Sequence, residues 1–148
     1  MSQLAFRYEY SDLFDPRHDD PEDAGSLTVS VETGQFSGTG TFHAGPEDVT
    51  KFGERLSAFP IAPDRPLEGT WGEGGRTSRV VVCATNATGT LLVSVEIDDD
   101  LSHFVRDRRV SEGVRTSFVT DYVQIDAFRR SIANLMDRKV DEAILRGH

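Results

Sequence analysis

The sequence predicts an α+β fold, a mainly antiparallel sheet of about six strands with two helices. Several short segments alternate between apolar and polar residues, as strands with one buried face do. Two longer segments instead carry apolar residues at helical spacing. The chain has 148 residues, enough for one core without disulfides or a structural metal. Residues 1–148 are therefore predicted to form a single domain.

Three strands are predicted in the first part of the chain. Residues 4–10 place alternate apolar side chains on one face, which is the pattern of a half-buried strand. The acidic segment 11–25, which contains two prolines and few apolar residues, predicts a solvated loop. Alternation resumes over 27–31, and a turn at 32–35 leads into a strand over 36–42. These two strands are predicted to form a hairpin.

The first helix is predicted from Pro46 to Phe59. Proline suits the first helical position, and the carboxylates of Glu47 and Asp48 suit the positive end of the helix dipole. Pro60 ends the helix because proline cannot continue its hydrogen-bond ladder. The apolar residues at helical spacing are Val49, Phe52, Leu56 and Phe59.

The second half starts with a proline-rich connection over 61–67, followed by Trp71 and a glycine-rich turn at 72–75. The charged segment 98–112 is predicted as a long loop or an irregular hairpin end. An amphipathic helix of about 20 residues is predicted over 123–145, which holds neither Gly nor Pro. The remaining three strands are predicted at 80–84, 91–97 and 114–123.

An internal similarity links the two halves. Five of six residues are identical between Leu27–Glu32 and Leu91–Glu96, and the apolar residues of the two predicted helices correspond as well. One interpretation is a two-fold β-β-β-α repeat, with halves 1–60 and 67–145, forming one continuous sheet with both helices over one face. The other is that any two amphipathic strand and helix units resemble each other. The sequence leaves both open.

The net charge of the chain indicates which classes of partner it could bind. The chain has 16 Lys and Arg against 25 Asp and Glu, a net charge of −9. This argues against nucleic acids and anionic membranes, whose binding depends on Lys and Arg, and favours a basic protein partner. Excess acid can also serve solubility alone. The single Cys83 indicates a reducing compartment, and the chain lacks an apolar run or a signal peptide, so a cytoplasmic location is predicted.

Catalytic motifs are missing from the sequence. It contains no phosphate-binding loop, nucleophile elbow or zinc-peptidase motif, and its four histidines share no metal-ligand spacing. Cys83 lies in an apolar run and is expected to be a buried small residue rather than a nucleophile. We therefore expect no cofactor, no metal site and no catalytic residues, although polar groups could still converge from distant positions.

Six residues are candidates for binding. The carboxylates of Asp98, Asp99 and Asp100 follow a strand and could face a basic partner, or be ordinary turn charges. Trp71, among glycines, is either a plug over the core or an exposed anchor. His43 stands between a strand and a helix. Tyr122 completes the set that a pocket could gather.

Two helix entries give the chain a resemblance to a known group. Pro-Glu-Asp-Val-x-x-Phe-x-x-x-Leu lies at 46–56, and Thr-Asp-Tyr-x-x-Ile-x-x-Phe lies at 120–128. With the strands around them, they resemble small uncharacterised bacterial proteins grouped with the WapI-type immunity proteins, over most of residues 27–140. The resemblance implies a protein that binds and neutralises a toxin domain without chemistry.

Two hypotheses of different class follow. In the first, the protein is a non-catalytic interaction protein whose acidic surface, formed by Asp12–Asp23 with Asp98–Asp100, meets a basic partner such as a toxin. In the second, the sheet and helices enclose a pocket for a small molecule, with or without turnover, at which His43, Trp71 and Tyr122 converge. The missing catalytic constellation favours the first. The oligomeric state stays open.

Overall fold

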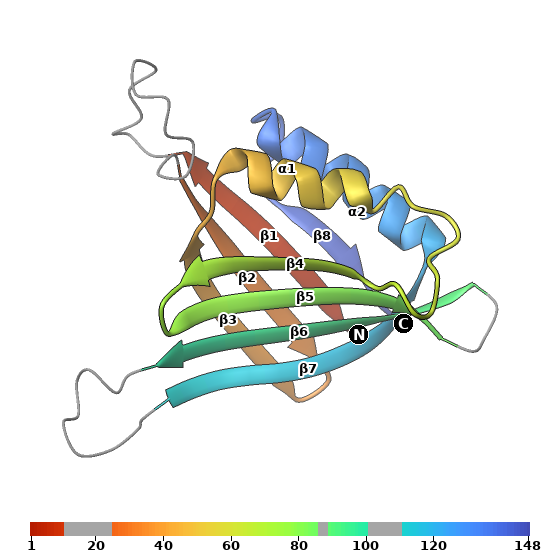
Figure 1. Cartoon of the computed structure of the whole chain (residues 1–148), viewed down its shortest axis with the longest axis horizontal. Coiled ribbons are helices and arrows are strands. Elements are labelled where there is room, and N and C mark those ends of the chain that lie inside the picture. Colours follow the sequence, from red (N-terminus) through yellow and green to blue (C-terminus); the bar gives the residue numbers. More distant parts are fainter. Residues whose placement is uncertain (11–24, 86–88, 101–110) are drawn as a thin grey trace.

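The chain folds into eight strands and two helices, in a computed structural model that describes residues 1–10, 25–85, 89–100 and 111–148 (Figure 1). The elements in chain order are β1 (Gln3–Tyr10), β2 (Gly25–Thr33), β3 (Phe36–His43), α1 (Pro46–Arg55), β4 (Leu67–Glu73), β5 (Arg76–Ala84), β6 (Thr90–Asp100), β7 (Ser111–Asp121), α2 (Tyr122–Met136) and β8 (Ala143–Arg146).

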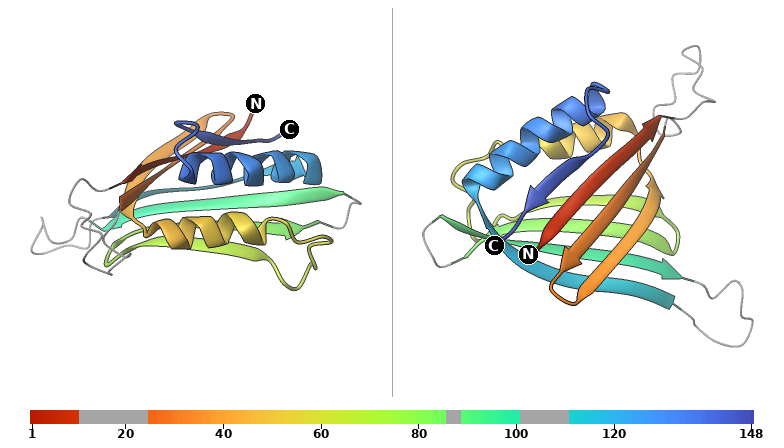
Figure 2. Two further views of the ribbon diagram at one scale, coloured as in Figure 1. Left: turned by 90° about the horizontal axis from the view of Figure 1, so that it is seen from above. Right: turned by 180° about the vertical axis from the view of Figure 1, so that it is seen from behind.

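The strands form two antiparallel sheets of four. The first has the order β3-β2-β1-β8, and the second has the order β4-β5-β6-β7. The two sheets cross face to face, and α1 and α2 lie side by side along one side of them (Figures 1 and 2). The α+β class and the antiparallel pairing predicted from the sequence are confirmed, whereas a single continuous sheet is not what forms.

The described residues form eight strands where about six were predicted, because β4 and β8 were missed. In β4 the inward positions are Leu67, Gly69 and Trp71, so a glycine interrupts the apolar alternation. A side chain at Gly69 would collide with the Trp71 ring, since an added Cβ would stand 2.5 Å from it. The strand therefore lacks the pattern by which strands are recognised.

β8 was predicted as the last turns of α2. The helix ends at Met136, and Arg138 adopts a left-handed conformation with φ of 61°. Its guanidinium carbon lies 4.1 Å from the centre of the Tyr10 ring, a cation–π contact that stabilises this turn. Ala143 and Leu145 then face the core as alternate residues of a strand. The helical spacing of Val140 and Ile144 was coincidental.

α1 begins at Pro46 as predicted but ends at Arg55, one turn before Phe59. The backbone N–H groups of Leu56 and Ser57 bond back three residues, to Gly53 and Glu54, which tightens the last turn. Phe59 then lies outside the helix with 77% of its surface exposed. The apolar residue at the end of the helical pattern is therefore not part of the core.

The two-fold β-β-β-α repeat, one of the two interpretations of the internal similarity, is not matched exactly. A helix follows three strands in the first half but four in the second, and β8 joins the sheet formed by the first half.

The charged segment 98–112 is partly strand, because β6 runs to Asp100 and β7 starts at Ser111. Residues 101–110 of that prediction, and most of the predicted loop 11–25, lie outside the described residues.

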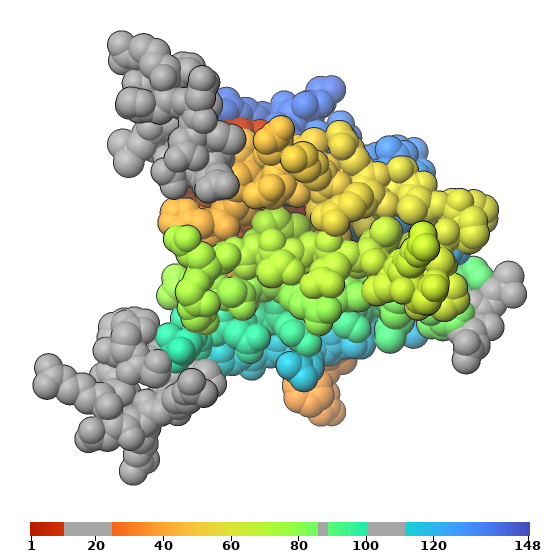
Figure 3. All heavy atoms as spheres, viewed as in Figure 1, coloured from red at the N-terminus to blue at the C-terminus, as the bar shows by residue number. Residues whose placement is uncertain are grey.

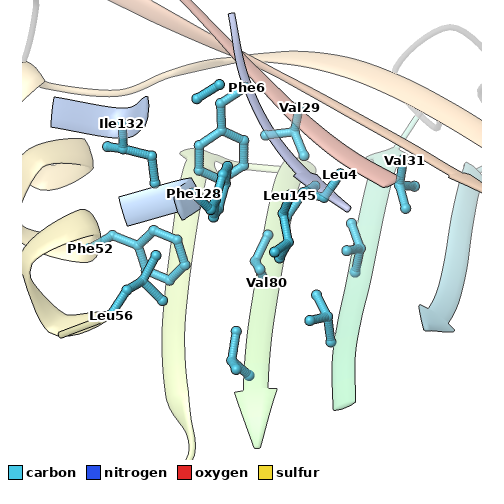
Figure 4. Close-up of a cluster of buried hydrophobic side chains, with 14 of the residues drawn as sticks. Leu4, Phe6, Val29, Val31, Phe52, Leu56, Val80, Phe128, Ile132 and Leu145 are labelled. Atoms are coloured by element: carbon cyan, nitrogen blue, oxygen red, sulfur yellow. The ribbon is translucent and has the colours of Figure 1, made fainter. Parts of the chain in front are cut away.

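The core fills the space between the two sheets and the helices. Phe6 of β1 is fully buried, and its ring centre lies 6.0, 5.3 and 5.2 Å from those of Phe52, Trp71 and Phe128. Figure 4 shows Phe6, Phe52 and Phe128 meeting between the helices and the strands, with Leu4, Val29 and Leu145 continuing the core along the first sheet. Apolar side chains from both sheets and both helices thus occupy the interior.

Candidate interaction groove

A groove runs along the outer edge of β3, where it crosses the ends of the second sheet. We call it the β3 groove. It has a volume of about 500 Å³ and is lined by Ser37–Phe42 of β3 and by Arg76, Ile97, Asp98, Asp99, Glu112, Gly113 and Val114. A smaller hollow of about 230 Å³ shares Thr41, Phe42 and Arg76 with it and continues past His43 to Glu73.

The close approach of the two sheets places β3 beside this groove. Alternate residues Gly38, Gly40 and Phe42 face the second sheet, and a Cβ on Gly38 would overlap Val114 of β7. A Cβ on Gly40 would lie 2.9 Å from the Ile97 side chain of β6. Glycine at these positions lets the backbones meet. Figure 2, right, shows β3 crossing the second sheet with the ends of β6 and β7 projecting beyond it.

Beyond β3, the second sheet carries a row of four charged side chains. We call Glu73, Arg76, Asp99 and Glu112 the charged rung, because they lie directly opposite one another on β4, β5, β6 and β7. Asp99 and Glu112 lie two residues from Ile97 on β6 and from Val114 on β7. Because side chains two residues apart in a strand point to the same side, the charged rung lies on the same face of the sheet as Ile97 and Val114. Arg76 Nη2 lies 3.0 Å from Asp99 Oδ2. The rung thus contains three carboxylates and one guanidinium.

The negative charge of the rung exceeds its positive charge. Arg76 neutralises Asp99, whereas Glu73 and Glu112 form no salt bridge with any described residue and are exposed. Asp98 also borders the groove and is exposed. An open groove with uncompensated carboxylates attracts cations and basic side chains.

Two of the three predicted aspartates of β6, Asp98 and Asp99, line this groove. Asp99 belongs to the charged rung, and Asp98 lines the groove on the neighbouring position of β6. Asp100 is exposed at the end of the same strand, and its backbone N–H donates to the Gly75 carbonyl at 2.8 Å. Asp12–Asp23, the other part of the predicted acidic surface, lies outside the described residues.

His43 and Trp71 lie towards the α1 end of β3. Both border a shallow hollow of about 180 Å³ together with Asp48 and Glu73. Trp71 is only 4% exposed, and its ring stands edge-on to Phe6 and Phe52 at 5.3 and 5.2 Å. It therefore serves as a plug over the core, one of the two roles considered for it, while His43 is exposed.

Tyr122 does not join this set. It begins α2 at the end of β7 opposite the groove, its hydroxyl accepts from the Ile61 backbone N–H at 3.0 Å, and its ring packs against Phe59 (Figure 1). The structure thus brings His43 and Trp71 near carboxylates but leaves Tyr122 apart.

Three members of the charged rung were not predicted as site residues from the sequence: Glu73, Arg76 and Glu112. One signal was available. Gly74 and Gly75 form a two-residue turn between Glu73 and Arg76, and such a turn places its flanking residues opposite each other. Glu112 gave no comparable signal, because the sequence between Asp100 and Ser111 contains neither Gly nor Pro to mark a turn.

Another hollow of the described surface lies between α1 and β4. It has a volume of about 640 Å³ and its rim has both signs of charge, with Asp48 and Glu54 against Lys51 and Arg55. Mixed charges partly cancel, so this hollow selects less strongly between basic and acidic partners than the β3 groove does.

Within the described ranges, no group of three or more His, Cys, Asp or Glu side chains is arranged to hold a metal ion. None of the helices that the structure describes is long and apolar enough to span a bilayer.

Comparisons of the chain with protein-family models, with curated proteins and with solved structures found no match. The resemblance to immunity proteins therefore stays a prediction from the sequence.

Proposed function

We propose that this chain is a non-catalytic interaction protein that binds a basic partner protein at the β3 groove. The observation that carries the proposal is the charged rung, in which Glu73 and Glu112 form no salt bridge with any residue that the structure describes and lie beside an open groove. The net charge of −9 adds a field of the same sign around it. Such a field raises the encounter rate with a cationic partner and selects against acidic ones.

The kind of partner follows from the resemblance to WapI-type immunity proteins. In this proposal the partner is a toxin domain with a basic surface, and binding neutralises the toxin by covering that surface. Neutralisation needs tight, specific contact and no chemistry by the bound protein. The acidic groove supports this role because it supplies charge complementarity at a fixed location on two rigid sheets.

A small-molecule ligand is the alternative. The β3 groove has a volume within the range of ligand sites, and Arg76 could meet an anionic group. However, Arg76 already bonds Asp99, and Glu112 lies next in the rung. An anion would have to displace one carboxylate and approach another, so the groove favours a cationic partner.

The test compares two double variants that lose the same charge. Glu73→Gln with Glu112→Gln changes the groove, whereas Asp64→Asn with Asp141→Asn changes exposed residues away from it. Each protein is immobilised and exposed to an extract of the cells that produce it. Any captured protein is then purified and titrated calorimetrically at low and at physiological salt.

We expect a basic protein that the wild type and the control variant retain and the groove variant loses. Its affinity for the wild type should fall steeply as salt rises, because the contact is between exposed charges. Equal retention by the two double variants, or an affinity that salt leaves unchanged, would overturn the proposal.

A further inference from the structure

We propose that the free edge of β3 accepts an extended segment of the partner as an added strand, with basic side chains placed over the charged rung. This inference rests on the proposed function and specifies how the β3 groove would be used. It depends on three features of the described chain: the unpaired edge of β3, the position of the rung beside it, and the absence of any residue that blocks pairing.

The backbone of β3 presents a regular set of hydrogen-bonding groups to the groove. The Ala44 N–H donates to the Gly25 carbonyl, which identifies Gly25 and Ala44 as a hydrogen-bonded pair. Because such pairs alternate in antiparallel sheets, the even-numbered residues of β3 bond to β2. The N–H and C=O groups of Ser37, Thr39, Thr41 and His43 therefore point outwards.

No described strand pairs with these groups. β3 ends the order of the first sheet, and the nearest strands of the second sheet cross it rather than run alongside it (Figure 2). An exposed edge of this kind is a template for another extended chain.

The second sheet would lie directly beneath a strand added to the edge of β3. β3 crosses the second sheet over Ile97 and Val114, and Asp99 and Glu112 lie two residues further along β6 and β7. Two residues of a strand span about 6.7 Å, and neighbouring strands lie about 4.8 Å apart. A strand paired with β3 would therefore run above the charged rung, with alternate side chains directed at it.

Charge selects the occupant. Side chains directed at the rung would meet Glu73, Glu112 and the Arg76–Asp99 pair, so Lys or Arg at alternate positions fits. A second copy of this chain fits poorly, because edge-to-edge pairing of two β3 strands would bring two such rungs together on molecules of net charge −9.

No residue of β3 itself protects the strand from pairing. Natural edge strands are commonly blocked by lysine, proline or a bulge. Phe36–His43 contains neither Lys nor Pro and pairs with β2 without interruption. The tip of this hairpin also projects beyond β7, where Figure 3 shows it in orange below the second sheet, and Phe36 at that tip is 66% exposed.

The first experiment uses three synthetic peptides on the wild-type protein, each of about eight residues, the usual upper range of a strand. One alternates lysine with threonine. The second has the same sequence with alternate backbone nitrogens methylated, so that it cannot pair. The third has glutamate in place of lysine. Affinity is measured by fluorescence anisotropy, and amide hydrogen exchange is followed at Ser37, Thr39, Thr41 and His43 by NMR.

We expect the lysine peptide to bind and to slow amide exchange at these four residues. N-methylation should weaken binding about tenfold or more, because edge recognition depends on main-chain hydrogen bonds, and glutamate should abolish it.

The second experiment changes the protein. Thr39→Pro removes one outward N–H, and proline is tolerated at such an edge position because its nitrogen faces away from the sheet. Thr39→Val keeps the N–H and is the matched control. We expect the proline variant to bind the lysine peptide about tenfold more weakly and the valine variant to bind like the wild type. If the proline variant does not fold, the methylated peptide still tests pairing on the unchanged protein.

The outcomes separate the two proposals. Equal binding of the lysine peptide and its methylated form would overturn strand pairing while leaving the acidic groove as a site for basic partners. Binding of the lysine peptide that Glu73→Gln with Glu112→Gln leaves unchanged would overturn the groove itself. Self-association that Thr39→Pro abolishes would identify a second copy as the occupant and overturn the basic partner. Failure of the lysine peptide to bind at all would overturn the added strand.

Discussion

Gly40 of β3 lies against Ile97 of β6 so closely that a Cβ added at Gly40 would stand 2.9 Å from the Ile97 Cγ2. The same Cβ would stand 2.5 Å from the Phe42 ring. This contact fixes the position of β3 across the end of the second sheet. Because the groove lies between β3 and the strand ends beyond it, the contact also determines where the groove forms.

Gly40→Ala should therefore destabilise the protein by about 1 to 3 kcal/mol, the usual cost of forcing extra atoms into a packed interface. Urea unfolding followed by circular dichroism would measure this. Ser37→Ala, an outward-facing change on the same strand, is the control and should alter stability by less than about 0.5 kcal/mol. If both variants unfold like the wild type, the two sheets do not meet tightly at Gly40.

The aromatic cluster around Phe6 should dominate the stability of the core. Phe6 is fully buried and contacts rings from both helices and from β4. Phe6→Ala should cost about 3 to 5 kcal/mol, the range for truncating a buried aromatic residue. Phe36→Ala removes the same atoms from a residue that is 66% exposed and should cost far less. Similar losses for the two variants in chemical denaturation would contradict this assignment of the core.

The sequence predicted those elements whose patterns are set by local burial. β2 and β3 alternate between more and less buried positions, and α1 begins at Pro46, because proline suits the first helical position. β4 could not be predicted, because Gly69 replaces an apolar residue where the Trp71 ring needs space. β8 could not be predicted either, since the end of α2 depends on the conformation of Arg138 rather than on Gly or Pro.

The candidate site was predictable only in part, for a related reason. Asp98 and Asp99 were recognised as acids after a strand, and both border the groove. The contribution of these aspartates to the charge of the groove depends on Arg76 and Glu112. These two residues are distant in sequence and become neighbours only through strand register. Register is set by how whole strands pack, so it cannot be deduced from the charged residues themselves.

Ser78 is a buried polar residue whose hydroxyl lacks a hydrogen-bond partner among the described residues. It is 1% exposed on β5, and among the described residues its Oγ has no hydrogen-bond partner. A buried hydroxyl without a partner costs free energy that an apolar side chain would not. Ser78→Ala should therefore raise the free energy of unfolding by about 1 kcal/mol. Loss of stability in thermal or urea unfolding would mean that the hydroxyl is bonded in solution.

Asp121 should stabilise α2 in a manner that depends on pH. Its Oδ1 accepts from the Gln124 backbone N–H at 2.9 Å, and its Oδ2 lies 2.9 Å from Nε2 of His148. The hydrogen bond from the Gln124 N–H is the main cause that holds the pKa of the Asp121 carboxyl below its ordinary value of 3.8, and the contact with His148 lowers this pKa further. The cap should contribute about 0.5 to 2 kcal/mol at neutral pH, which Asp121→Ala would remove.

The sign of the pH effect follows from the direction of that shift. Because the folded state favours the ionised carboxyl, its extra stability is present above the unfolded pKa near 3.8 and is lost as pH falls through the lower folded value. Asp121→Asn keeps an oxygen that can cap the helix but does not titrate, so it is the matched control. The difference in unfolding free energy between wild type and Asp121→Asn should therefore shrink as pH falls from neutral to about 3. A difference that stays constant over that interval would show that the charge of Asp121 contributes nothing and that capping geometry alone holds the helix start.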